Sequence, residues 1–189
     1  LISGNAVLTD LSGLTNMVTT NGVFIQENDA LTNLEGLEGL TLIGPDGLYI
    51  ENNPSLLTLA GLNSLSSIGG TFELIDNNAL NDLSGLNSLL SIGGNFNLIN
   101  NNALNDLSDI TNLSSIGEFL KIDRNDSLID ISGFNNLNDI GEYLIISNNA
   151  VFTTISGMHK FTTAKGLLIT DNNSLLILSG LNSLTTIYE

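Results

Sequence analysis

The sequence predicts a mainly β fold, a right-handed solenoid of about eight coils of about 24 residues with a parallel sheet on one face. The first observation behind this prediction is a motif, L-x-[IL]-x-x-N-x-x-L, that returns along the whole chain. The second is that apolar residues after each motif fall at every third position. The third is composition, because 42% hydrophobic and 13% charged residues are enough for a core and too few charges for disorder. We expect one domain over residues 1–189, as a fragment of a longer chain.

The repeat keeps its register from the first residues to the last. Its central asparagines are Asn5, Asn28, Asn53, Asn77, Asn101, Asn125, Asn149 and Asn172. Neighbouring members are 23, 25, 24, 24, 24, 24 and 23 residues apart. One turn of this length cannot bury enough apolar surface to fold alone, so stability is expected to come from stacking of neighbouring coils.

The first element of each coil is a short strand. The L-x-[IL] segment alternates with period two, as in Phe72 and Leu74, and it is rich in β-favouring residues. Because the segment recurs once per coil, the sequence predicts parallel pairing between copies one coil apart.

The remainder of each coil has period three, as in Leu80, Leu83 and Leu86. This period suits 3₁₀ turns, polyproline-like extension or short strands joined by bends, and it argues against long convex helices. A recurrent glycine predicts a bend with left-handed backbone. These glycines are Gly13, Gly36, Gly61, Gly85, Gly133, Gly157 and Gly180, with Asp109 as the exception. An insertion at residues 44–47 and a deletion at residues 165–166 are expected to lie in turns.

The charge balance excludes several classes of partner. The formal net charge is −16, and the only basic residues are Lys121, Arg124, Lys160 and Lys165. Such a surface is poorly suited to neutralise phosphates, so we expect no nucleic-acid partner, and anionic membranes are poor partners. No apolar run is long enough for a membrane span, so we expect no membrane insertion. The absence of cysteine excludes disulfides and thiolate chemistry.

The strand motif followed by L-x-x-L-x-G-L-x-x-L-x-x-I-G, as in LNDLSGLNSLLSIGG from Leu80, resembles leucine-rich repeats and, more closely, the receptor L domain. The resemblance covers essentially all 189 residues, although the cysteines of the animal modules are absent. It implies a bacterial secreted or cell-surface protein with an adhesion or ligand-binding role. It also implies that the motif asparagines form a buried ladder bonded to the backbone of adjacent coils. The alternative fold within this family is a horseshoe with short convex helices.

The outward positions of the strands are the predicted binding surface for a protein or glycan. These residues are Phe24, Tyr49, Glu73, Ile75, Asn97, Ile99, Lys121, Asp123, Ile145 and Leu168. Solvent-facing hydrophobic side chains on one flat sheet mark an interface. The other interpretation is that β-favouring residues occupy a strand surface and pack along the ladder. If the first interpretation holds, charged substitutions of Phe24, Tyr49 and Ile99 abolish binding without unfolding the chain.

A column of aspartates is the candidate metal site. Asp82, Asp106 and Asp130 occupy equivalent positions on successive coils, about 4.8 Å apart if the coils stack as strands do. Either a cation such as Ca²⁺ bridges these carboxylates or they are hydrated surface groups. No other cofactor is expected.

Three functions follow from these features. The first is a non-catalytic extracellular binding or adhesion module. The second is a structural subunit that stacks end to end or side by side into fibres, or binds copies of itself, which light scattering would detect. The third is a polysaccharide-cleaving β-helix enzyme that uses the aspartate column beside Lys121 and Arg124. The only histidine, His159, has no nucleophile motif nearby, so catalysis is not predicted.

Overall fold

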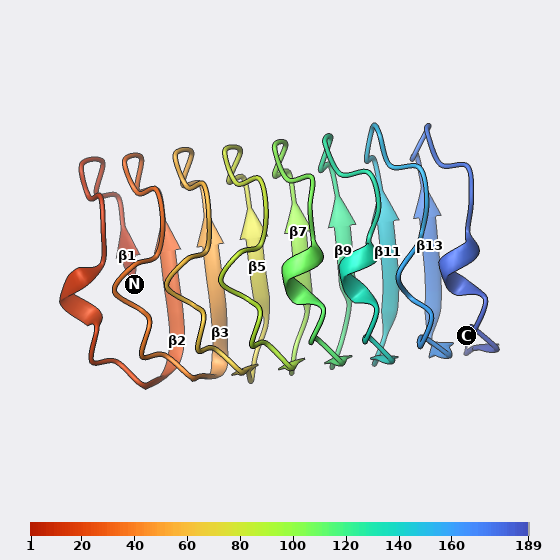
Figure 1. Ribbon diagram of the computed structural model, residues 1–189, viewed down its shortest axis with the longest axis horizontal. Helices are drawn as coiled ribbons and strands as arrows, with labels where there is room; N and C mark the ends of the chain where they lie inside the picture. The colour runs from red at the N-terminus through yellow and green to blue at the C-terminus, as the bar shows by residue number, and fades with distance from the viewer. Residues whose placement is uncertain (189) are drawn as a thin grey trace.

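The chain folds as a row of eight stacked coils that runs from one end of the molecule to the other (Figure 1). This computed structural model describes residues 1–188. Each coil contributes one strand to a parallel sheet, which lies behind in the view, and returns along the opposite side through bends or a short 3₁₀ helix. The predicted mainly β solenoid of about 24 residues per coil is therefore confirmed.

Three kinds of element make up the coils. The strands of the outward sheet face are β1 (Ile2–Ser3), β2 (Thr19–Gln26), β3 (Leu42–Glu51), β5 (Phe72–Ile75), β7 (Phe96–Ile99), β9 (Leu120–Asp123), β11 (Tyr143–Ser147) and β13 (Gly166–Thr170). Short strands at the lower corner are β4 (Ser67–Ile68), β6 (Ser91–Ile92), β8 (Ser115–Ile116), β10 (Asp139–Ile140), β12 (Thr163–Ala164) and β14 (Thr186–Ile187). The 3₁₀ helices are η1 (Ser12–Leu14), η2 (Ser108–Ile110), η3 (Ser132–Phe134) and η4 (Ser179–Leu181).

Strand pairing follows the repeat register residue for residue. Phe72 pairs with Phe96 and Phe96 with Leu120, so equivalent side chains of successive coils stack directly. The inward column includes Leu74, Leu98 and Ile122, all fully buried. In the interior the rings of Phe72 and Phe96 stack at 5.0 Å between centroids. The core is one continuous hydrophobic cluster, mainly aliphatic, that extends along the array.

The side of the coil opposite the sheet contains no α-helix within residues 1–188. The horseshoe with convex helices is therefore not the fold. The recurrent glycine adopts two conformations rather than the single left-handed bend predicted. Gly36, Gly61, Gly85 and Gly157 have positive φ. Gly13, Gly133 and Gly180 lie inside 3₁₀ helices, as does Asp109.

Close approach between coils is one reason why glycine recurs at this position, on the side opposite the sheet, in both conformations. A Cβ atom on Gly133, inside a 3₁₀ helix, would lie 1.8 Å from the carbonyl oxygen of Leu107 in the preceding coil. A Cβ atom on Gly36, which has a left-handed backbone, would lie 2.0 Å from the carbonyl oxygen of Leu11. At Gly133 and Gly36 the neighbouring backbone therefore leaves no room for a side chain. Gly13 in the first coil has no such neighbour, and Asp109 occupies the equivalent position of its coil.

The length irregularities do not both form turns. The insertion at residues 44–47 lies within strand β3, where the pairing with β2 shifts register between Thr20 and Gly22. It is therefore a β-bulge. The deletion at residues 165–166 lies where β12 ends and β13 begins. The ladder of short strands is interrupted before it, because β12 pairs with β14 in a separate two-stranded sheet and not with β10.

Candidate functional site

The asparagine ladder is buried at the end of the sheet strands and satisfies backbone groups that the strands leave unpaired. Asn101 has an exposed fraction of 0%. Its Oδ1 accepts the backbone N–H of Asn77 (3.0 Å), and its Nδ2 donates to the carbonyl of Leu74 (2.9 Å). Its own N–H donates to Oδ1 of Asn125 (3.1 Å). The same pattern runs from Asn28 to Asn149, so these amides are scaffold groups.

The residue before each ladder asparagine has left-handed backbone, which sequence reasoning missed. These residues are Gly4, Glu27, Asn52, Asp76, Asn100, Arg124, Asn148 and Asp171, with φ between 53° and 69°. Gly, Asn and Asp tolerate this conformation, and their recurrence at one position was the available signal. The turn aims these side chains outward, where they flank the outward sheet face.

The outward sheet face holds the predicted binding residues in two columns, one through Phe24 and Tyr49 and one through Ile75 and Ile99. Nine of the ten are half-buried or exposed, and Leu168 is the most open at 49%. The sheet brings them together on one surface, as predicted. Asp123 differs, because only 3% of its surface is exposed.

On this face aromatic rings cover the backbone of glycine residues. Phe24 and Tyr49 stack in parallel with centroids 4.9 Å apart. Each ring leans over the glycine two residues earlier, since a Cβ on Gly22 or Gly47 would lie 3.0 Å from it. The bulge at residues 44–47 lies beside this pair, because a Cβ on Gly22 would also lie 2.7 Å from the Cβ of Asp46. The sole insertion of the array is thus next to a surface aromatic pair.

A second stacked pair lies farther along the sheet. Phe119 and Tyr143 have centroids 5.6 Å apart, and the Tyr143 ring covers Gly166. Tyr143, Ile145 and Leu168 help line an apolar hollow of about 510 Å³ near the last coils. Hydrophobic patches therefore occupy both ends of the outward sheet face.

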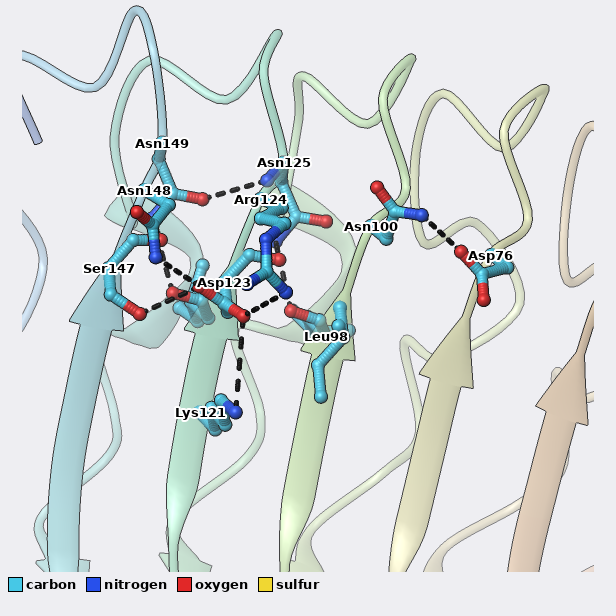
Figure 2. A network of polar contacts seen from close by, with 12 residues as sticks. Asp76, Leu98, Asn100, Lys121, Asp123, Arg124, Asn125, Ser147, Asn148 and Asn149 are labelled. Carbon is cyan, nitrogen blue, oxygen red and sulfur yellow. Dashed lines mark hydrogen bonds and ion pairs between the residues drawn. The ribbon is translucent and has the colours of Figure 1, made fainter. Parts of the chain in front are cut away.

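Between these patches, Asp123 is the centre of a polar network (Figure 2). Its carboxylate accepts hydrogen bonds from Oγ of Ser147 (2.8 Å) and Nδ2 of Asn148 (2.9 Å). Arg124 pairs with it at 3.0 Å and Lys121 at 3.9 Å. Side chains from the next coil thus cover the carboxylate. This explains why Asp123, which was predicted to be exposed, is buried.

The charge state of Asp123 links this network to stability. Burial by itself would raise the pKa of Asp123, but the bonds from Asn148 and Ser147 and the two nearby cations outweigh it and lower the pKa. The stabilisation is therefore present at neutral pH and is lost as the pH falls from the ordinary value of 3.8 through the lower folded pKa.

We expect Asp123→Asn to lower the free energy of unfolding at neutral pH and to have a smaller effect as the solution is acidified. The variant lacks the charge that Arg124 and Lys121 neutralise, and this difference vanishes once the native carboxylate is protonated. Urea unfolding across the acid range measures it. Asp126→Asn, an exposed change on the same coil, is the matched control. A constant difference between Asp123→Asn and the native chain at all pH values would contradict the linkage.

Within residues 1–188, the carboxylates near Phe24 and Tyr49 form no salt bridge. Glu51 accepts from Nε2 of Gln26 (3.1 Å), and Glu73 accepts from Nδ2 of Asn97 (2.8 Å). Burial, followed by the charges of Glu73 and Asp76, raises the pKa of Glu51. This end of the face therefore carries excess negative charge.

The candidate metal column has a structural role. Oδ1 of Asp82, Asp106 and Asp130 each accepts the backbone N–H of the serine two residues later, at 3.0, 2.7 and 2.8 Å. Asn33 makes the same turn with Glu35. Within residues 1–188 no group of three or more His, Cys, Asp or Glu side chains is placed to hold a metal ion. These aspartates are turn-forming residues that stabilise the corner.

The remaining sequence candidates do not assemble into a second site. His159 is exposed and makes no salt bridge with a described carboxylate. No helix in the described part of the chain has the length and apolar character needed to cross a membrane. Comparison with models of protein families, with curated proteins and with solved structures finds no match in any of the three.

Proposed function

We propose that this chain is a non-catalytic binding module that presents the outward sheet face to a protein or glycan. The observation that carries the proposal is the difference between the inward and the outward side chains of each strand. Inward positions hold buried hydrophobic residues in every central coil, whereas outward positions change from aromatic to acidic to basic to aliphatic along the array. A scaffold alone does not need that variation, and a recognition surface does.

The continuity and the composition of this surface support recognition. Phe24, Tyr49, Ile75, Ile99 and Ile145 are half-buried on one continuous sheet, so they offer apolar area without disturbing the core. Polar groups between them provide orientation, as in interfaces with an apolar centre and polar contacts. We further propose that the chain is related to the leucine-rich repeats and the receptor L domain, and that it acts outside the cell or at its surface. The motif and the solenoid support that assignment.

Selection from libraries tests the proposal without a known partner. Peptide-display and glycan libraries are selected on the native chain, and the recovered ligands are tested against Tyr49→Lys/Ile99→Lys. A matched variant, Asn63→Lys/Asn87→Lys, places the same charges at exposed positions on the side opposite the sheet. We expect the first variant to lose the ligands and the second to keep them, with unfolding curves close to native for both. Ligands that bind both variants equally would contradict the proposal.

A second function, end-to-end stacking, is favoured by the two end coils. Val7 at the first coil has an exposed fraction of 88%, and Leu176 at the last has 80%. Each end face is the counterpart of an interface between coils, so the end coil of a second copy fits it. Mass that grows with concentration in light scattering would support stacking, and a constant monomer mass would exclude it for this chain.

A further inference from the structure

The distribution of charge along the sheet is uneven. Residues 1–120 contain 13 of the 20 acidic residues and none of the four Lys and Arg residues. The three salt bridges found within residues 1–188 all lie between Lys121 and Lys165. Within residues 1–188, therefore, no Lys or Arg side chain pairs with the carboxylates of the first coils.

Glu51 and Asp123 show the contrast at equivalent positions of the same column. Asp123 is paired with two cations and closed by the next coil, so the chain neutralises it internally. Glu51 accepts a hydrogen bond from the neutral amide of Gln26, and the negative charge of Glu73 lies close enough to repel it. Holding carboxylates together without a cation is unfavourable, and a positive ligand would relieve that repulsion.

We propose that the acidic–aromatic patch, defined as Phe24, Tyr49, Gln26, Glu51 and Glu73, docks a Lys- and Arg-rich polypeptide segment. This inference rests on the proposed function and names the chemistry of its partner. The stacked rings of Phe24 and Tyr49 supply apolar area and π-faces for cations, and the carboxylates supply charge complementarity.

A hollow beside the patch adds room for a basic side chain. It lies where β2, β3 and β5 end, has a volume of about 610 Å³, and is lined by Glu27, Asp29 and Asp76 with the neutral residues Asn52, Pro54 and Asn78. Three carboxylates around a hollow of this size suit an extended Lys or Arg side chain whose apolar stem rests on Pro54.

A second copy of this chain is a poor occupant of the patch. The patch is acidic, and a second copy with a net charge of −16 would add mostly negative charge to it. Lys121 and Arg124 are already paired with Asp123, so a second copy offers few cations for the patch. The charge complementarity therefore favours a different, basic polypeptide.

Titration with a short peptide of alternating Lys and Ser, followed by amide NMR shifts at an ionic strength of about 0.15 M, tests the inference. We expect shifts centred on Phe24, Tyr49 and Glu51. Glu51→Gln/Glu73→Gln should weaken binding at least tenfold, because these substitutions keep the acceptors for Gln26 and Asn97 and lose only charge. Tyr49→Ala should also weaken it.

The matched control is Asp106→Asn/Asp130→Asn, which changes net charge equally and keeps the serine turns beside the 3₁₀ helices. We expect this control to weaken binding less than about threefold, since distant charges are screened. Equal weakening by both double variants, or no binding of the Lys–Ser peptide, would overturn the inference. If a matching Gln–Ser peptide or a library ligand then bound the outward sheet face, the proposed function would hold and only the inference of a basic partner would fail. If no ligand shifted that face, both would fail.

Discussion

Asn101→Ala is expected to be among the most destabilising single substitutions in this chain, lowering the free energy of unfolding by about 4 kcal/mol. It removes the acceptor of the Asn77 N–H and the donor to the Leu74 carbonyl, and both bonds lie in buried surroundings. Each buried group left without a partner costs roughly 1–3 kcal/mol. Because coils stabilise one another, the loss is expected to weaken both neighbouring interfaces.

The adjacent residue is a matched control for this prediction. Asn102 has the same side chain but is exposed, so Asn102→Ala should change stability by less than about 0.5 kcal/mol. Urea denaturation followed by circular dichroism measures both variants. Equal effects at positions 101 and 102 would show that the ladder is not a structural requirement.

Phe96→Ala is the second large effect, with an expected loss of about 4 kcal/mol. Phe96 is fully buried, stacks on Phe72 at 5.0 Å and meets Phe134 edge-on at 6.4 Å. Removing the ring leaves a cavity in the centre of the array, where coils on both sides have already packed.

Phe24→Ala separates the core aromatics from the surface aromatics. Phe24 is half-buried on the outward sheet face, so its loss should cost about 1 kcal/mol and should affect ligand binding more than folding. Thermal unfolding and the peptide titration together distinguish the two positions. A Phe24→Ala chain as unstable as Phe96→Ala would mean that this ring is a structural element of the sheet.

The register, the strand positions and the interior were predictable because they follow from periodicity. Stacked coils require identical spacing, so Asn77 and Asn101 had to be equivalent, and period two assigned Leu74 and Leu98 to one side of the strand. Burial confirms both. The exclusion of long convex helices followed from period three, which no α-helix matches.

Features that depend on contacts between different side chains of adjacent coils were not predictable. Period two places Asp123 outward, but whether a side chain is covered depends on Ser147 and Asn148 of the next coil. The glycine itself does not determine the choice between left-handed backbone and a 3₁₀ helix, since Gly36 and Gly133 approach the preceding coil equally closely in the two conformations. The left-handed residue before each ladder asparagine was obscured by Glu27 and Arg124, which rarely adopt that conformation.

Every assignment of scaffold and binding surface depends on the asparagine column being inside the molecule. Hydrogen exchange of side-chain amides, measured by NMR, tests this most directly. The amide protons of Asn53, Asn77 and Asn101 bond to buried carbonyls, whereas Asn63 and Asn102 are exposed. We expect exchange at least about a hundredfold slower for the first group. Equal rates in the two groups would place the column in solvent and contradict the division between interior and binding face.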